Sequence, residues 1–191
     1  MKKKYQIIYA DPPWKFEVWN RDTGLGRSAE SHYPTMNFND LLSFPIDDIA
    51  DKDCALFLWS TPPLLSEAIA LIEGWGFEYK TKAFCWVKTT MRGLHWGMGY
   101  WTRANTEDCL LATRGNPRRI DKGIHQVIMS DVLDHSHKPA IVRERIVQLM
   151  GDLPRIELFA RQRVAGWDCW GNEVESDINL DIKGGEKQWQ I

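Results

Sequence analysis

Residues 5–19, YQIIYADPPWKFEVW, begin as an apolar run and end abruptly in an acid, two prolines and a tryptophan. The run Tyr5 to Ala10 has the length and composition of a strand that is covered on both faces of a sheet. Asp11, Pro12 and Pro13 favour a tight turn directly after it, because Asp bonds its own backbone and proline presets φ. Taken alone, the tetrapeptide would be explained by this turn.

Apolar runs of similar length recur along the chain and predict further strands. Helical patterns lie between them, with Thr61 as a candidate N-cap and Gly74 and Gly151 as stops. Alternating strands and helices predict an α/β fold with a mostly parallel sheet, whose ligands gather at the carboxyl ends of the strands. The expected strands are 5–10, 54–59, 81–87, 108–113, 126–129 and 155–160, and the expected helices are 39–43, 61–74 and 139–150.

The chain has 191 residues, 43% of them hydrophobic, which suits one domain. We expect residues 1–173 to form it and residues 174–191 to be an acidic, polar tail that is loosely ordered. The apolar run behind Met1 is too short for a signal peptide or a membrane span, so we expect a cytoplasmic protein.

Four cysteines lack any C-x-x-C pair and are expected to be reduced core residues: Cys54, Cys85, Cys109 and Cys169. His135 and His137 could ligate a metal, but no cysteine or H-E-x-x-H spacing supports a site, so no metal is expected. The formal net charge of −2 gives no global sign of a nucleic-acid partner.

Charge is nevertheless uneven along the chain. The segment from Lys80 to Lys122 holds nine Lys or Arg residues against three acids. Such an excess suits phosphate binding, although an ordinary solvated face explains it equally well. Trp96 and Trp101 lie beside Arg92 and Arg103 in the same segment, a composition that suits unpaired bases, whereas most tryptophans are simply core residues.

Common cofactor motifs are absent. The sequence has no G-x-x-x-x-G-K-[ST], and its close glycine pair, Gly97 and Gly99, follows no apolar strand. G-x-S-x-G is also absent. Hydride transfer, ATP-dependent and α/β-hydrolase chemistry are therefore disfavoured.

The stretch after the first strand fits one demanding reaction. An exocyclic amine on adenine or cytosine is a poor nucleophile, because its lone pair is delocalised into the ring. The Asp11 carboxylate and the Pro12 carbonyl could accept hydrogen bonds from both N–H groups, and Pro13 would stiffen the turn that aims that carbonyl. Trp14 could stack on the base. The pattern therefore indicates an acceptor site for an amine that develops positive charge.

Seven segments occur in an order that resembles the DPPW-type adenine amino-methyltransferases, the family of the eukaryotic messenger-RNA adenosine methyltransferase and of short bacterial and phage enzymes. The resemblance runs from about residue 6 to residue 173. It implies a Rossmann-like fold in a permuted motif order, S-adenosylmethionine as methyl donor, and transfer to adenine N6. The segments are ADPPW (10–14), HYPTM (32–36), LFLWSTP (56–62), WVKT (86–89), TEDCLLATRGNP (106–117), SHKP (136–139) and RIELFAR (155–161).

The resemblance also implies residue roles. Asp11, Pro12, Pro13 and Trp14 would form the catalytic motif, and Lys138 would pair with the donor carboxylate. Tyr33 belongs to a loop that would close over the site. The other implied cofactor contacts are Asp11, Glu157, Phe159, Arg161, Asn172 and Glu173, and the substrate side is expected to include Lys88 and Glu107, together with Arg118 and Arg119 from the basic segment.

The sequence departs from the family pattern in three places. Ten residues precede Asp11, so the contact that an earlier segment makes to the donor adenine in eukaryotic relatives must come from elsewhere or be missing. Gln162, Arg163 and Val164 replace a frequent His-Asn, and Glu173 replaces a glutamine. These differences weaken the expected cofactor contacts but leave the reaction class unchanged.

Three functions remain open from the sequence. The first is methylation of adenine N6 in DNA, with the base flipped out or single-stranded. The second is the same reaction on RNA. The third is a non-catalytic partner subunit that keeps the fold, and assembly as a homodimer or with a partner is also possible. No cysteine is placed as a nucleophile, so we expect direct transfer without a covalent intermediate.

Overall fold

The computed structural model describes residues 3–15, 35–97, 99, 101–132 and 137–180. Helices α2 (Phe38–Leu42), α3 (Leu65–Gly74) and α4 (Ile141–Met150) are accompanied by two short 3-10 turns, Ile46–Asp48 and Pro62–Leu64. The strands are β1 (Tyr5–Ala10), β2 (Ala50–Ser60), β3 (Glu78–Thr90), β4 (Gly93–Leu94), β5 (Thr106–Arg114), β6 (Val127–Asp131), β7 (Arg155–Leu158) and β8 (Asp168–Trp170).

All six predicted strands and the three predicted helices are present among these elements. β1 has the predicted bounds. β2 and β3 are longer than predicted, because their pairing continues through polar residues that the apolar pattern does not mark. The prediction missed β4 and β8, which have two and three residues. Thr61 flanks the first turn before α3 but makes no side-chain cap.

One sheet runs through the molecule in the order β4-β3-β5-β2-β1-β7-β8, with β6 paired to β3. The pairs β1–β2, β1–β7, β7–β8 and β3–β6 are parallel. β5 is antiparallel to both of its neighbours, β2 and β3, and β4 is antiparallel to β3. Six strands, β1, β2, β3, β6, β7 and β8, therefore run in one direction, as expected for a mostly parallel sheet, whereas β4 and the interior strand β5 run in the opposite direction.

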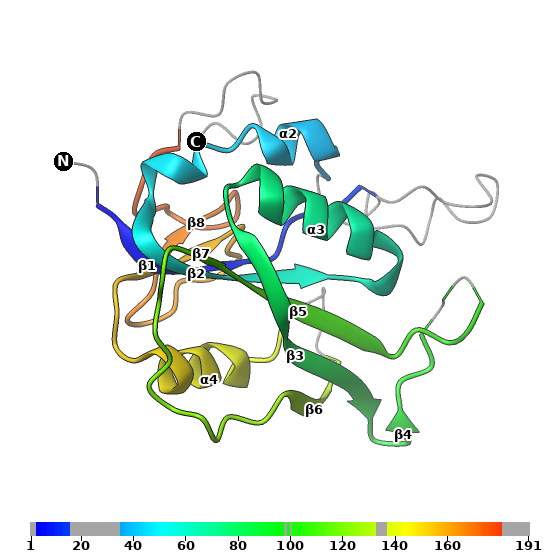
Figure 1. Ribbon diagram of the computed structural model, residues 1–191. Coiled ribbons are helices and arrows are strands. Elements are labelled where there is room, and N and C mark those ends of the chain that lie inside the picture. Colours follow the sequence, from blue (N-terminus) through cyan, green and yellow to red (C-terminus); the bar gives the residue numbers. More distant parts are fainter. Residues whose placement is uncertain (1–2, 16–34, 98, 100, 133–136, 181–191) are drawn as a thin grey trace.

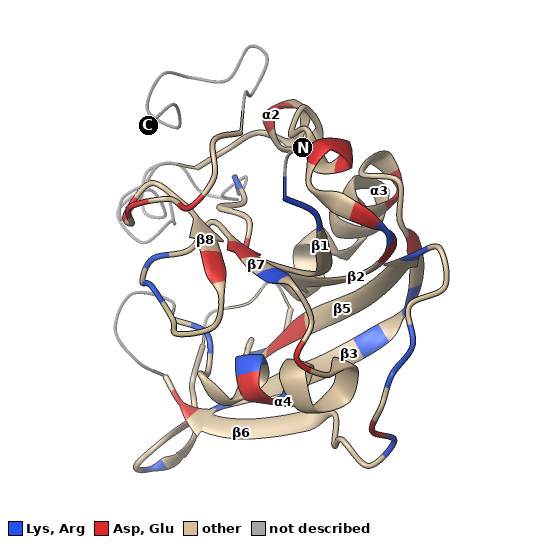
Figure 2. Ribbon diagram, turned by 90° about the vertical axis from the view of Figure 1, so that its left-hand side faces the viewer, with Lys and Arg blue, Asp and Glu red and all other residues tan. Residues whose placement is uncertain are grey.

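Helices cover both faces of the sheet (Figure 1). α2 and α3 pack Leu41, Leu71 and Ile72 onto one face, and α4 packs Val142 and Ile146 onto the other. Figure 2 shows the sheet curling so that β6 lies beside α4. Arg145 of α4 donates to the backbone carbonyl of Val127 in β6 at 2.9 Å. The core thus consists of two apolar layers separated by the sheet.

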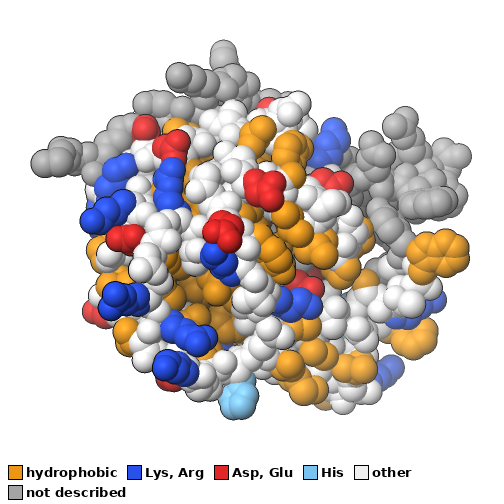
Figure 3. Space-filling model, in the orientation of Figure 1, with side chains coloured by type: hydrophobic (Ala, Val, Ile, Leu, Met, Phe, Trp, Pro, Cys, Tyr) orange, Lys and Arg blue, Asp and Glu red, His pale blue; other side chains and the backbone are white. Residues whose placement is uncertain are grey.

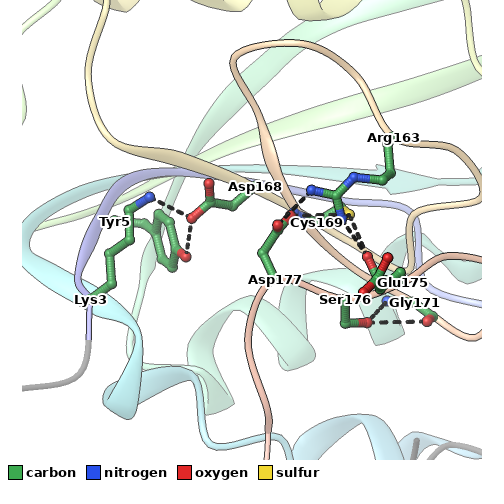
Figure 4. A network of polar contacts seen from close by, with 9 residues as sticks. All are labelled: Lys3, Tyr5, Arg163, Asp168, Cys169, Gly171, Glu175, Ser176 and Asp177. Atoms are coloured by element: carbon green, nitrogen blue, oxygen red, sulfur yellow. Dashed lines mark hydrogen bonds and ion pairs between the residues drawn. The ribbon is translucent and has the colours of Figure 1, made fainter.

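The segment after β8 packs against the sheet as far as residue 180. Asp177 accepts a hydrogen bond from the backbone N–H of Cys169 at 2.8 Å and pairs with Arg163 at 2.6 Å (Figure 4). Arg163 and that N–H hold the pKa of Asp177 below its usual range. Leu180 is buried. Loose order is therefore wrong for residues 174–180, and residues 181–191 lie outside the described part.

Asp168 anchors the other side of the same region. Its carboxylate accepts hydrogen bonds from Lys3 and from the Tyr5 hydroxyl, both at 2.6 Å (Figure 4). Burial and this carboxylate raise the pKa of Tyr5 above its usual range. The edge strand β8 is thereby connected to the beginning of β1.

Among the described residues, no helix has the length and apolar character needed to cross a membrane.

Asp177→Ala should release the C-terminal segment, because the Cys169 amide and Arg163 both lose their acceptor. We expect exchange of the Cys169 amide hydrogen to accelerate by about tenfold and thermal stability to fall. Hydrogen exchange with mass detection measures the first effect. Asn179→Ala, at an exposed position of the same segment, is the matched control, and equal exchange in both variants would contradict the anchoring role of Asp177.

Candidate active site

Strand register gathers charged side chains at one edge of the sheet, on the face covered by α4. Tyr9, Trp59, Cys109, Trp86 and Ile128 all lie in the core layer beneath α4. Side chains alternate along a strand, so residues two positions away share their face. Asp11, Glu107, Lys88 and Ser130 are therefore aligned on the α4 face, each at the edge where β1 ends and β5 begins.

Lys138 connects the charged residues at this edge. Its Nζ lies 2.8 Å from Oδ2 of Asp11 and 3.2 Å from Oε2 of Glu107, and Lys88 pairs with the other oxygen of Glu107. The Lys138 side chain is only 8% exposed. A charge at this depth is stable only when it is paired and hydrogen-bonded. Two cations and two anions thus form one compact cluster, which we call the charge cluster (Asp11, Lys88, Glu107 and Lys138).

Pairing fixes the protonation states of Glu107 and Lys138. Burial alone would raise the pKa of Glu107, but Lys138 and Lys88 hold that pKa below its usual range. Burial would lower the pKa of Lys138, and Asp11 and Glu107 raise it instead. Lys138 and Glu107 therefore stay charged across the physiological pH range.

Aromatic side chains form the floor below Lys138. Its ammonium lies 5.4 Å from the centre of the Trp59 ring, and Trp59 Nε1 donates to the Tyr9 hydroxyl at 2.7 Å. Trp14 Nε1 donates to the backbone carbonyl of Trp59 at 3.1 Å, and the Trp14 side chain is buried. Trp14 thus anchors the Asp-Pro-Pro-Trp turn to the core, and its stacking on a base stays a prediction.

The Pro12 carbonyl, which the sequence analysis expects to accept from the amine, already accepts one hydrogen bond within the turn. The Pro12 carbonyl accepts a hydrogen bond from the Trp14 N–H at 2.9 Å, and the Pro13 carbonyl accepts one from Met36 at 2.8 Å. A carbonyl oxygen has two lone pairs, so the Pro12 oxygen retains acceptor capacity. The bond to Trp14 adds to the stiffness that the two prolines already supply.

Glu157 is held by a residue that the sequence interpretation missed. Arg143 of α4 donates from Nε and Nη2 to the two carboxylate oxygens of Glu157, each at 2.6 Å. Both residues are buried, and burial raises the pKa of Glu157 although Arg143 opposes the shift. Two features of the sequence could have identified Arg143. Glu157 was expected on a buried strand, where a carboxylate requires a cation, and Arg143 lies three residues before Ile146 on the apolar side of a helix.

The other expected cofactor residues follow β7 and β8. Phe159 has φ 61° and packs its ring against Phe44 and Trp170, with ring centres 5.1 and 5.7 Å apart. Nε of Arg161 lies 3.8 Å from Oε1 of Glu173, so these two residues, both expected to contact the cofactor, form an ion pair with each other. Asn172 is half-buried in the turn after β8. Because β1 and β7 are parallel neighbours, Phe159 and Asp11 follow adjacent strand ends.

Arg118 and Arg119 are not brought to the charge cluster. β5 is antiparallel to β2, so its carboxyl end pairs near Cys54, at the sheet edge opposite Asp11. The eight residues from Glu107 to Arg114 span roughly 23 Å. Arg119 instead lines a cleft of about 380 Å³ between the sheet and the end of α4. The expected substrate contact at these two arginines is therefore not supported by their position.

The sequence analysis did not assign two hydroxyl groups near the charge cluster to the site, and it expected Thr61 only as an N-cap. Thr61 Oγ1, directly after β2, and Ser130 Oγ, opposite Lys88, are buried and have no hydrogen-bond partner within the described residues. Serine and threonine are too common for sequence alone to identify them. Tyr33 and His135 lie outside the described residues, and among the described ones no group of three or more His, Cys, Asp or Glu could hold a metal.

The sequence resembles the DPPW-type adenine amino-methyltransferases. An α/β sheet with charged residues at its strand ends and a rigid Asp-Pro-Pro-Trp turn agrees with that class of protein. A family model confirms it: residues 5–173 match MT-A70, and the chain belongs to this family. It is 36% identical to the type II methyltransferase M.MunI of a Mycoplasma species, covering 96% of this chain and 84% of that protein.

Eukaryotic relatives match over a smaller part of their length. The chain is 29% identical to the human N(6)-adenosine-methyltransferase catalytic subunit METTL3, covering 93% of this chain and 30% of METTL3. The Drosophila melanogaster N(6)-adenosine-methyltransferase MT-A70-like protein is also 29% identical, with 27% of its length covered. The chain therefore corresponds to less than a third of these eukaryotic proteins.

Arg143→Met should lower the free energy of unfolding by about 3–5 kcal/mol, because it leaves the buried Glu157 without its cation. The double variant Arg143→Met, Glu157→Leu removes both charges and should recover most of this loss. Urea unfolding of the single and double variants measures the difference. Equal destabilisation in both would show that the pair does not act as a unit.

Glu107→Gln should destabilise the protein in a pH-dependent manner. The folded-state pKa of Glu107 lies below its unfolded value of 4.5, so the unfolded chain binds more protons between the two values. The stabilisation by Glu107 is therefore present above about pH 4.5 and lost as the pH falls through the folded-state pKa.

We expect the gap in unfolding free energy between wild type and Glu107→Gln to be about 1–3 kcal/mol near pH 7 and to shrink below pH 4.5. Chemical unfolding at pH 3.5, 4.5, 5.5 and 7 follows this gap. A gap that is constant over this series would contradict the pairing of Glu107 with Lys88 and Lys138.

Proposed function

We propose that the chain is an S-adenosylmethionine-dependent methyltransferase that acts on the N6 amine of adenine. The observation that carries the proposal is the position of Asp11. Its carboxylate follows β1 on a turn stiffened by two prolines and is paired to the buried Lys138 at 2.8 Å. Membership of MT-A70 and the names of the methyltransferase relatives support the same reaction.

Asp11 and the Pro12 carbonyl would act on the amine. Hydrogen bonds from its two N–H groups to these acceptors localise the nitrogen lone pair and stabilise the positive charge that grows during methyl transfer. Preorganisation matters here, because an acceptor that does not move costs nothing to orient during the reaction. Lys138 holds Asp11, and the Trp14 N–H holds the Pro12 carbonyl.

The charge pattern fits the methyl donor, which supplies an electrophilic methyl group on a sulfonium when it is bound. Lys138 offers a cation for the donor carboxylate, since an ammonium has three N–H donors that it can share between acids. Thr61 offers a buried hydroxyl without a partner among the described residues. The residues that we expect to hold the donor are Asp11, Lys138, Glu157, Phe159, Arg161, Asn172 and Glu173.

Glu157 has a defined capacity for this role. A carboxylate offers about four lone pairs, and Arg143 takes one on each oxygen. The remaining lone pairs suit hydroxyl groups, such as the two on a ribose. The arrangement also supports a Rossmann-like fold with permuted motif order, since the first strand of the chain, β1, is the direct neighbour of the late strand β7.

Methyl transfer would be direct and in line. Cys109 is the cysteine nearest to Asp11 in the sheet register, and it is fully buried. Burial, together with the charge of Asp11, raises its pKa well above the usual value. A thiolate nucleophile is therefore not favoured, and the amine itself would attack the methyl group.

DNA is the substrate that we propose, because the chain corresponds to 84% of a type II methyltransferase but to 30% of METTL3. RNA is the second candidate, because METTL3 is an N(6)-adenosine-methyltransferase catalytic subunit and adenosine is the ribonucleoside of adenine. A non-catalytic subunit is disfavoured, since Asp11, Lys138 and Glu157 are all present and paired. Methylation of matched DNA and RNA oligonucleotides, followed by digestion to nucleosides and mass detection of N6-methyladenosine species, distinguishes the three.

Asp11→Ala should abolish methyl transfer, with at least a roughly hundredfold loss of kcat, because the amine loses its charged acceptor. Donor binding should persist in part, since the other donor contacts are unchanged. Nucleoside mass detection measures the reaction and calorimetry with S-adenosylmethionine measures binding. Glu73→Ala, an exposed acid on α3, is the control, and near-normal turnover of Asp11→Ala would refute the role of Asp11.

A further inference from the structure

Two large aromatic side chains project into solvent beside the charge cluster. Trp101 is 96% exposed and Trp96 is 75% exposed, and both lie between β4 and β5. Tryptophan is normally buried in large part, so an exposed pair marks a surface that contacts another molecule. We call this loop the tryptophan hairpin (residues 91–97, 99 and 101–105).

The tryptophan hairpin is closely folded rather than extended. A Cβ atom on Gly97 would collide with the carbonyl oxygen of Ala104, and one on Gly99 with that of Thr102. Only glycine permits these close backbone approaches. The guanidinium of Arg103 lies 5.0 Å from the centre of the Trp96 ring, a cation–π contact that orients both side chains. The described part of the hairpin is therefore compact, and Arg103 orients the Trp96 ring.

Backbone hydrogen bonds join the base of the hairpin to the charge cluster. The Lys88 N–H donates to the Asn105 carbonyl at 2.8 Å, and the Lys88 carbonyl accepts from the His95 N–H at 2.9 Å. Glu107, the ion-pair partner of Lys88, follows two residues after Asn105. The tryptophan hairpin therefore begins directly beside the charge cluster.

The chemistry of the hairpin selects a polyanion with flat, apolar faces. No acidic residue occurs between Glu78 and Glu107, whereas Arg92 and Arg103 are both exposed. Figure 3 shows hydrophobic and basic side chains next to each other at the end of the molecule that carries β4. Unpaired nucleotides match both features, because bases stack on aromatic rings and phosphates bind arginine.

We propose that the tryptophan hairpin holds the unpaired nucleotides next to the target adenine, with one base stacked on Trp101 and another on the Trp96–Arg103 pair. This inference rests on the proposed function and specifies its substrate as a strand that is locally single-stranded. A paired duplex hides its base faces inside the stack, so the hairpin favours a flipped or melted target.

The test is the affinity of the full chain for a labelled single-stranded DNA of roughly 12 nucleotides, measured by fluorescence anisotropy. Trp101→Ala should weaken binding roughly 5- to 150-fold, and Trp101→Phe should retain most of the affinity because a ring remains. The affinity for a fully paired duplex of the same sequence should change little in Trp101→Ala. Ile120→Ala, a 71% exposed apolar residue at the opposite sheet edge, is the control and should bind as wild type.

Binding does not require methyl transfer, so this experiment is independent of the proposed reaction. Wild type that binds the strand without methylating it would refute the reaction and leave the hairpin proposal intact. Unchanged affinity in Trp101→Ala and Trp96→Ala would overturn the hairpin proposal. If these variants instead convert a dimer to a monomer in sedimentation at unchanged affinity, the surface is an interface with a second copy and the proposal is wrong.

Discussion

A buried ammonium between two carboxylates is the interaction on which this structure depends. Lys138 precedes α4, Asp11 follows β1 and Glu107 lies at the start of β5, so one side chain joins three segments that are far apart in sequence. The attraction offsets the cost of removing three charges from water only if all of them are present. Each of the two most buried members, Lys138 and Glu107, has two partners of opposite charge, so the cluster holds the geometry around Asp11 through several ion pairs at once.

A second buried pair fixes the same helix further along. Arg143 binds Glu157 through two hydrogen bonds, and Ile146 packs into the core between the sheet and α4. An apolar face alone would allow a helix to slide or rotate, because dispersion contacts are not directional. Two directed ion pairs remove this freedom. The start of α4 is thus held against the ends of β1, β5 and β7, where precise positions matter for chemistry.

The apolar runs of the sequence predicted the strands well, because such runs mark buried segments. The charged residues at the strand ends were expected from the family resemblance, and their roles stay predictions. Strand direction could not be predicted in this way, since the same apolar pattern suits parallel and antiparallel neighbours. The position of Arg118 and Arg119 depended on that direction. Arg143 was missed because an arginine in an amphipathic helix is normally solvated, and only its contact with Glu157 reveals its burial.

The reversal of β5 has two linked consequences. It carries the segment after Arg114 to the far edge of the sheet, and it brings the connection between β3 and β5 to the edge that holds Asp11. Lys88 and Glu107 face each other because they flank this connection. In an all-parallel sheet, a crossover would separate them by the length of the sheet. The antiparallel direction of β5 therefore explains why Lys88 and Glu107 lie at the edge that holds Asp11. It also explains why the exposed tryptophans of the β3–β5 connection lie beside the charge cluster.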